Sequence, residues 1–381
     1  MKLNLTLLFG GQSTEHEVSI SSARNVFQAL DPEKYQVDSI YITEAGEWHY
    51  LVDDQWLSQS PQHSLNQLRS QRVLIAPGEL EQGWVLNDLQ TKIKVDCIIP
   101  MLHGTLGEDG ALQGLFEMLN LAYVGSNILG SAICMNKHVT KQLLKAQGVA
   151  TANWKVLTVE ERSQINFDLI KRELGPSLFI KPANLGSSVG MTKVNNSESF
   201  NLAIDEAFKY SDMILIEEYV KGREIECAVL GNEIISCTVP GEIIPHEDFY
   251  TYSAKYLEPE GKGATLNAPA DLDPDLIAQF KLIALKAYKI LGCAGLARID
   301  FFLTDQLKIL VNEINTIPGF TNISMYPRLW QLEGLNYPQL IDELISLAIQ
   351  KHRQKQSIIR IYRHKKKQEE KKPLFNSPSN H

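Results

Sequence analysis

Cysteine is scarce in this sequence of 381 residues, and the copies that occur are scattered. No CxxC spacing occurs, and the total is odd: Cys97, Cys134, Cys227, Cys237 and Cys293. A disulfide framework or a cysteine zinc site needs paired or closely spaced cysteines. The pattern therefore indicates reduced thiols in a cytoplasm.

The sequence also lacks long apolar runs and an excess of positive charge. No stretch approaches the roughly 18 apolar residues that a membrane helix needs. The N-terminal run is short and contains Asn4 and Thr6, so it predicts a buried strand rather than a signal peptide. A formal net charge of -8 argues against nucleic acid as the main partner, although an anionic ligand can still be held locally.

The composition, 44% hydrophobic and 22% charged, is typical of a soluble globular protein, and the length suits two or three domains. Strand-like and helix-like segments alternate in residues 1–140, which predicts an N-terminal open α/β domain. Residues 141–225 and 226–350 follow an α+β pattern, which predicts two lobes. The segment 351–381 carries ten Lys or Arg against two acids. We expect it to be a flexible, solvated tail, with adhesion to an acidic partner or a membrane surface as the alternative.

Four polar residues interrupt two apolar strands that predict a hairpin between positions 298 and 315. Alternation places Arg298 and Asp300 on one face, and Glu313 and Asn315 share a face of the partner strand. Burying ionised carboxylates without compensation costs several kcal/mol each, whereas two carboxylates and an amide oxygen suit Mg²⁺ when phosphate completes its octahedron. The alternative is a structural salt bridge from Arg298 to Asp300 at a sheet edge, which leaves the other two residues without a reason.

A glycine-rich loop follows an apolar strand in SLFIKPANLGSSVGM, residues 177 to 191. Lys181 ends the strand, and Gly186, Ser187 and Ser188 follow. Such a loop turns backbone N–H groups toward an anion, and hydroxyls and an ammonium add further contacts, so it would cradle nucleotide phosphates. It matches neither the Walker loop nor GxGxxG, and a hairpin turn beside an ordinary lysine is the alternative.

Three further segments carry weaker signals. In FGGQSTEHEVSISSA a strand meets Gly10 and Gly11, and a helix with a Ser or Thr cap is expected next. Glu15 would either suit the helix dipole or bind a substrate ammonium. His103 follows an apolar strand, where a lone histidine is usually a local hydrogen-bonding residue. The aromatic stretch 247–256 would either anchor its loop or form a lid.

Taken together and in this order, these segments resemble the D-alanine–D-alanine ligase family of ATP-grasp enzymes. The resemblance covers about residues 3–350. It rests on seven segments in matching order and spacing: GGQSTEHEVS, HGTLGEDG, KPANLGSSVGM, EEYVKGREIE, FYTYSAKY, RIDFF and VNEINTIPGFT.

This resemblance implies an α/β and α+β architecture, in which an ATP-grasp fold follows a Rossmann-like open α/β domain. The implied reaction is the ATP-dependent ligation of two D-alanines through an acyl phosphate, for peptidoglycan synthesis, cell wall biogenesis and cell shape. The implied partners are D-alanine, ATP as co-substrate and a second copy in a homodimer. The implied cofactor is Mg²⁺, as two ions, or Mn²⁺. A cytoplasmic location without a membrane span or nucleic acid accords with this reaction.

The resemblance also implies roles for individual residues. Those expected to bind ATP are Lys137, Lys181, Ser187, Ser188, Glu217, Val220, Glu224 and Tyr250. The expected metal ligands are Asp300, Glu313 and Asn315. Catalytic roles fall to Glu15, Ser187, Tyr256, Arg298 and the backbone N–H of Gly319. Substrate contacts fall to His103, Lys255, Ser324 and Met325.

Other functions remain open at this point. The family's depsipeptide-forming relatives usually replace the tyrosine at position 256, so Tyr256 favours an amide product over a D-alanine–D-lactate ester. Another carboxylate–amine ligase of the same fold, or a non-catalytic nucleotide-binding protein, is also an alternative. A nicotinamide-dependent oxidoreductase is disfavoured, because FGGQST lacks the GxGxxG spacing and no acid ends the second strand.

Overall fold

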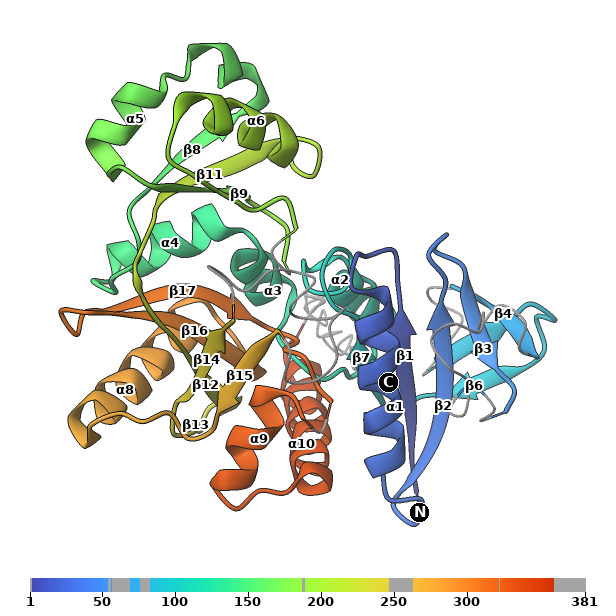
Figure 1. Cartoon of the computed structure of the whole chain (residues 1–381). Helices are drawn as coiled ribbons and strands as arrows, with labels where there is room; N and C mark the ends of the chain where they lie inside the picture. Colours follow the sequence, from blue (N-terminus) through green and yellow to red (C-terminus); the bar gives the residue numbers. More distant parts are fainter. Residues whose placement is uncertain are drawn as a thin grey trace, which may run out of the picture.

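The computed structural model describes residues 2–53, 56, 69–75, 83–186, 189–246, 263–321 and 323–359. Within these ranges the strands form three sheets, each with its own helices (Figure 1). In the view of Figure 1 the middle sheet lies above the C-terminal sheet, and the N-terminal sheet lies to the right of both. None of the helices in the described ranges is long and apolar enough to cross a bilayer.

The N-terminal sheet has the order β6-β5-β4-β3-β2-β1-β7. Its strands are β1 (Leu3–Gly10), β2 (Tyr35–Ile42), β3 (Trp48–Leu51), β4 (Ser70–Leu74), β5 (Gly83–Leu86), β6 (Lys92–Lys94) and β7 (Cys97–Met101). Only β1 pairs in parallel, with β2 and with β7, and the remaining pairs are antiparallel. The predicted open α/β pattern thus holds for the parallel part. The antiparallel extension was not predicted; it follows from strands that succeed each other without a crossover helix.

Helix α1 (His16–Ala29) forms the crossover from β1 to β2. Gly10 and Gly11 have φ of 92° and 98°, and a Cβ at Gly10 would lie 2.1 Å from the carbonyl oxygen of Ile42. Only glycine fits this turn, which brings the start of α1 to the C-terminal edge of β1. The expected Ser or Thr cap is wrong: the N-cap residue is Glu15, and its side chain makes no capping hydrogen bond.

The middle sheet is antiparallel, with the order β10-β9-β11-β8. Its strands are β8 (Trp154–Thr158), β9 (Leu178–Pro182), β10 (Thr192–Val194) and β11 (Met213–Glu218), with helices α5 (Phe167–Leu174) and α6 (Ser197–Ala207) on one face and the 3-10 helix Val159–Gln164 at its end. Ile180, Ile214 and Ile216 pack into the core beneath these helices. Because strand residues alternate, Lys181 and Glu217 point to the opposite face.

The C-terminal sheet has the order β15-β14-β12-β16-β17, and β13 pairs with β12. Its strands are β12 (Gly222–Gly231), β13 (Ile235–Cys237), β14 (Gly241–Pro245), β15 (Ala264–Asn267), β16 (Gly295–Thr304) and β17 (Ile309–Asn315). The remaining helices in the described ranges are α2 (Ala111–Met118), α3 (Ile128–Met135), α4 (Lys137–Ala146), α8 (Pro274–Ile290), α9 (Met325–Leu332) and α10 (Tyr337–Gln356). Figure 1 shows α4 between the middle and C-terminal sheets.

Helix α10, near the C-terminal end of the described chain, packs against N-terminal elements. Leu344 and Ile345 of α10 share a hydrophobic core with Val26 of α1 and Ile99 of β7. The helix continues to Gln356, past the point where we placed the start of the basic tail. The domain boundaries remain predictions, and residues 360–381 of the tail lie outside the described ranges.

Candidate active site

The predicted hairpin of polar residues is confirmed. β16 and β17 pair antiparallel, with Asp300 opposite Glu313 and Arg298 opposite Asn315. Arg298 Nε and Nη2 each donate to Asp300 at 2.7 Å, and Asn315 Nδ2 donates to Asp300 at 2.9 Å. The alternative that we kept open, an Arg–Asp salt bridge beside the edge strand β17, is therefore also present.

Two carboxylates stabilise the positive charge of Arg298. Besides Asp300, Arg298 Nε lies 3.2 Å from Glu226 Oε1 of β12. Burial alone would lower the pKa of Arg298, but Asp300 and Glu226 hold it well above its ordinary value. The guanidinium thus remains a fixed cation inside the protein.

A β-bulge shapes the edge strand at the centre of the site. Asp300 pairs with Glu313 but Phe301 pairs with Val311, so Asn312 is an extra residue in β17. Asn312 Oδ1 accepts from Lys181 Nζ at 3.3 Å, and Glu313 Oε2 lies 3.7 Å from Lys137 Nζ. Neighbouring strand residues normally point to opposite faces, and a bulge re-aims one of them. Asn312 was missed from the sequence.

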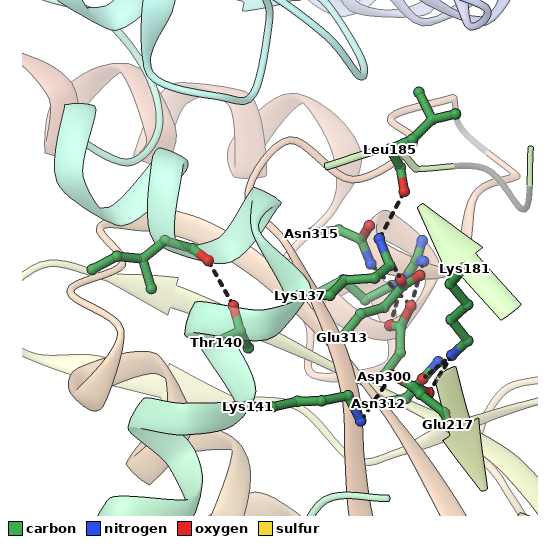
Figure 2. A network of polar contacts seen from close by, with 12 residues as sticks. Lys137, Thr140, Lys141, Lys181, Leu185, Glu217, Asp300, Asn312, Glu313 and Asn315 are labelled. Carbon is green, nitrogen blue, oxygen red and sulfur yellow. Dashed lines mark hydrogen bonds and ion pairs between the residues drawn. The ribbon is translucent and has the colours of Figure 1, made fainter. Parts of the chain in front are cut away.

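Buried lysines lie against this hairpin (Figure 2). Lys137 opens α4, and its Nζ also donates to Leu185 O at 2.7 Å, just before the predicted phosphate loop. Lys181 of β9 lies 2.8 Å from Glu217 Oε2 of β11. Both lysines are under 10% exposed, so their charge is little screened by solvent.

A third buried lysine completes the cluster. Lys141 stands one turn after Lys137 on α4, and its Nζ lies 3.1 Å from Glu217 Oε1. Burial alone would raise the pKa of Glu217, but Lys141 and Lys181 lower it to about 2. Glu217 is therefore an ionised, buried carboxylate between two ammonium groups. The sequence suggested no role for Lys141.

The candidate metal ligands satisfy the donor chemistry of a hard cation. Two carboxylates, Asp300 and Glu313, and the amide of Asn315 meet across paired strands, with the predicted phosphate-binding lysines opposite. Within the described ranges no group of three or more His, Cys, Asp or Glu is arranged to hold a metal. An ion bound here would therefore need the amide oxygen and oxygens from the nucleotide, as Mg²⁺ typically does.

The loop after β7, the loop after β17 and helix α1 meet at His103. His103 Nδ1 lies 2.9 Å from Ile317 O, and His103 Nε2 lies 3.1 Å from Ser22 Oγ of α1. Burial lowers the pKa of His103. Since a carbonyl only accepts, Nδ1 donates to it and the neutral ring accepts from Ser22. The interpretation of His103 as a local hydrogen-bonding residue agrees with this geometry, and its contact with substrate remains a prediction.

Glu15 lies close to both predicted ligand loops. Its side chain is buried, and a Cβ built on Gly104 would lie 2.6 Å from Glu15 Oε2. A Cβ built on Gly186 would lie 3.6 Å from the same oxygen. The start of α1 is thus adjacent to Gly186, the glycine that opens the predicted phosphate loop.

A second carboxylate at this end was missed from the sequence. Glu108 Oε2 accepts from Gly104 N at 2.7 Å, and Glu108 Oε1 accepts from Ile317 N at 2.9 Å. Glu108 therefore connects the loop after β7 with the loop after β17 through hydrogen bonds. Burial and the nearby Glu15 raise the pKa of Glu108 to about 8. Its place in HGTLGEDG was the available signal, because an acid in a glycine-rich loop usually bonds backbone N–H groups.

The remaining predicted residues occupy several positions. Gly319 lies beside Ser324, whose Oγ is 3.4 Å from a Cβ built on the glycine, and Ser324 is the N-cap residue of α9. Met325 is buried in the core, and its sulfur would lie 2.4 Å from a Cβ at Gly241, so its side chain has a packing role. Val220 follows β11, and Glu224 is half-buried in β12. Five predicted residues lie outside the described ranges: Ser187, Ser188, Tyr250, Lys255 and Tyr256.

Comparison with known proteins shows which family the chain resembles. Residues 4–126 match the family model described as D-ala D-ala ligase N-terminus, and residues 143–346 match D-ala D-ala ligase C-terminus. The chain is 47% identical over 365 residues to a D-alanine–D-alanine ligase of Coxiella burnetii, covering 95% of this chain and 97% of that protein. It is 44% identical to D-alanine–D-alanine ligase A of Escherichia coli, covering 92% of this chain and 97% of that protein.

Solved structures give the same result. A Coxiella burnetii D-alanine–D-alanine ligase superposes with a TM-score of 0.82 at 41% identity, covering 93% of this chain and 97% of that one. The VanG D-Ala:D-Ser ligase of Enterococcus faecalis has the same TM-score at 33% identity, covering 91% of this chain and all of that one.

Two antiparallel α+β lobes, with buried lysines set against paired carboxylates, define an ATP-dependent ligase of the ATP-grasp class. The chain belongs to the D-alanine–D-alanine ligase family. The predicted family, fold class and enzyme class are thus confirmed. The roles of individual site residues remain predictions.

Proposed function

We propose that this chain joins two D-alanines to D-alanyl-D-alanine, with ATP converted to ADP and phosphate, for peptidoglycan synthesis. The carboxylate of one D-alanine takes the γ-phosphoryl group of ATP, and the amine of the second D-alanine then displaces phosphate. One observation carries the proposal: Lys137 and Lys181 lie against the Asn312–Glu313 segment of the hairpin, at 3.7 Å and 3.3 Å. Such an arrangement of cations and carboxylates suits a metal-bound triphosphate.

At the nucleotide end, the two lysines supply fixed positive charge for the phosphate oxygens. We assign Val220 and Glu224, which border the segment between β11 and β12, to the adenine and ribose. Asp300, Glu313 and Asn315 are the proposed metal ligands, and Mg²⁺, as two ions, is the proposed cofactor. When bound, Mg²⁺ supplies charge neutralisation and orients the phosphate oxygens.

At the amino-acid end, Glu15 is placed to receive the ammonium of the first D-alanine. The attack of the second amine on the acyl phosphate creates a tetrahedral oxyanion, which needs donors fixed beforehand. Arg298 is such a donor, because its two carboxylate partners hold the guanidinium in place. The backbone N–H of Gly319 is the second proposed donor, and Ser324 and Lys255 are proposed to contact the second D-alanine and the phosphoryl group.

Further parts of the proposal rest on the sequence and on the reaction. Water destroys an acyl phosphate, so a closing loop is needed, and the aromatic stretch 247–256 is our candidate. We also propose that the chain works in the cytoplasm as a homodimer. Five buried, free cysteines suit that location.

The direct test is an incubation of the purified protein with ATP, Mg²⁺ and D-alanine, with phosphate release and product mass as readouts. We expect phosphate release that depends on D-alanine, with D-alanyl-D-alanine formed in equal amount. L-alanine serves as the matched control and should give no product. Phosphate release no greater than in the sample without amino acid would contradict the proposal.

A second candidate differs only in the acceptor. The similarity to an Enterococcus faecalis D-Ala:D-Ser ligase favours testing D-serine beside D-alanine and D-lactate as the second substrate. Each competitor is added to a D-alanine reaction across a pH series, and the products are separated by mass. We expect the dipeptide to dominate with the wild type, and Tyr256→Phe to shift the balance toward the other acceptors. A dominant ester or D-alanyl-D-serine product would favour the second candidate.

A further inference from the structure

Lys141 is a buried cation that the proposed reaction does not use. Its side chain is 1% exposed, and its Nζ lies 3.1 Å from Glu217 Oε1 and donates to Ala152 O at 3.3 Å. Burial lowers the pKa of Lys141, and its partner Glu217 counters that shift. Burying an ammonium group is costly, so a lysine is kept at such a position only if its charge has a use or its partners require it.

Lys141 is not required simply to hold helix α4 in place. Helix α4 has other anchors: the Asn136 side chain caps its first turn, and Thr140 Oγ1 donates to Ile133 O at 2.6 Å. Leu144 of the same helix is fully buried in a hydrophobic core. A well-packed apolar side chain would stabilise such a helix at least as well as a buried ion pair does.

The charges of Lys141, Lys181 and Glu217 indicate a different role for Lys141. Glu217 contacts Lys181 through one oxygen, at 2.8 Å, and Lys141 through the other, at 3.1 Å. The group of two ammonium ions and one carboxylate carries a net positive charge. Without Lys141, the Lys181–Glu217 pair would be neutral, and Lys181 would attract phosphate less strongly.

The contacts also form a path between the lobes. Lys141 of α4 holds Glu217 of β11, Glu217 holds Lys181 of β9, and Lys181 donates to Asn312 of β17 at 3.3 Å. Figure 2 shows Lys141 at the lower left, Glu217 at the lower right and Lys181 on the right above Glu217. Glu217 thus has an ammonium partner at each carboxylate oxygen, which favours a fixed position for Glu217 and for the Lys181 ammonium.

We propose that Lys141 is a positioning residue for ATP: it holds Glu217 so that Lys181 keeps a fixed place and a net positive charge for the nucleotide phosphates. This inference rests on the proposed function, because it needs the triphosphate to lie at Lys181. It predicts that Lys141 matters more for ligands with phosphates than for adenosine alone.

The experiment measures the Kd of ATP and of adenosine by calorimetry on full-length wild type, Lys141→Met and Lys141→Arg. We expect Lys141→Met to weaken ATP binding about tenfold, equivalent to about 1.4 kcal/mol, and to change adenosine binding by less than about twofold. The thermal midpoint should be unchanged or higher. Lys141→Arg keeps the charge and should restore ATP binding to within about threefold of the wild type. Lys145→Met, an exposed lysine one turn further along α4, is the matched control and should bind ATP like the wild type.

The outcomes are distinguishable. Equal weakening of ATP and adenosine, or unaltered ATP binding in Lys141→Met, would overturn the inference. If Lys141→Met does not fold, Lys141→Gln replaces it, and failure of both to fold would assign Lys141 a purely structural role and also overturn the inference. A wild-type protein that binds no ATP would instead contradict the proposed function.

Discussion

Arg298 and Asp300, two residues apart on β16, are joined by two hydrogen bonds of 2.7 Å each. The same carboxylate accepts from Asn315 Nδ2 at 2.9 Å. Asp300 thus connects the proposed oxyanion donor with the proposed metal ligands. A change in its charge should therefore affect both metal binding and the second step of the reaction.

Asp300→Asn tests this double connection. We expect an activity loss of about 100-fold, because the amide is a weaker metal ligand and offers Arg298 only one acceptor oxygen. The Mg²⁺ concentration for half-maximal rate should rise about tenfold or more. A magnesium titration of the steady-state rate measures both effects. Asp305→Asn, in the exposed turn of the same hairpin, is the control and should behave as the wild type. An unaltered magnesium requirement in Asp300→Asn would show that Asp300 is not a metal ligand.

Ser22→Ala tests the junction at the amino-acid end. Ser22 Oγ lies 3.1 Å from His103 Nε2, and Phe320 N donates to it at 3.5 Å. The substitution leaves a buried ring nitrogen unpaired, and we expect the free energy of unfolding to fall by about 1 to 2 kcal/mol. The KM for D-alanine should rise more than the KM for ATP, because the loop that carries Gly319 is loosened. Urea unfolding and steady-state kinetics are the measurements, with the neighbouring Ser21→Ala as control, and equal changes in both KM values would count against a local effect.

Helix α10 offers a pair of truncations with different expected results. Ending the chain after Ile359 keeps Lys351, which donates to Gly125 O at 3.3 Å, and the ion pair of Lys355 with Glu117. We expect its activity to stay within about twofold of the wild type, since the tail has no predicted catalytic role. Ending it after Gln350 removes both lysines and should lower the free energy of unfolding by about 1 to 2 kcal/mol. Thermal unfolding separates the two variants. A large loss of activity in the variant that ends after Ile359 would assign the tail a function.

The parts of the site that follow from local alternation were predictable. The faces shared by Arg298 with Asp300, and by Glu313 with Asn315, depend only on the period of a strand. Gly10 and Gly11 likewise indicated a turn by their residue type alone. Resemblance to a family then gave the fold class, which no single motif established.

The parts that depend on pairing between distant segments were not predictable. Asn312 reaches Lys181 because a bulge displaces it, and the register of β17 against β16 decides where the bulge falls. Lys141 meets Glu217 across 76 positions of sequence, and nothing near either residue indicates the contact. The expected hydroxyl cap on α1 was wrong because the turn after Gly11 makes Glu15 the N-cap residue.

Glu108 gives a prediction for the pH dependence of stability. Its pKa is raised to about 8 in the folded protein by burial and by Glu15, against an ordinary value of 4.5. Between these two values the folded protein holds a proton that the unfolded chain has released, so the free energy of unfolding falls as the pH rises toward 8. Below about pH 4.5 the contribution of this group is fully present, and above about pH 8 it is lost.

Glu108→Gln removes this titration while keeping a neutral group of similar shape. We expect the difference in unfolding free energy, variant minus wild type, to increase as the pH is raised from 7 to 9. Measurement above pH 7 keeps most of the titration of His103 outside the range, because its ordinary pKa is 6.5 and burial lowers it in the folded protein. Urea unfolding of both proteins at each pH gives the difference directly. Parallel curves would mean that Glu108 is already ionised at pH 7, and that its two backbone N–H partners, Gly104 and Ile317, outweigh burial and the repulsion by Glu15.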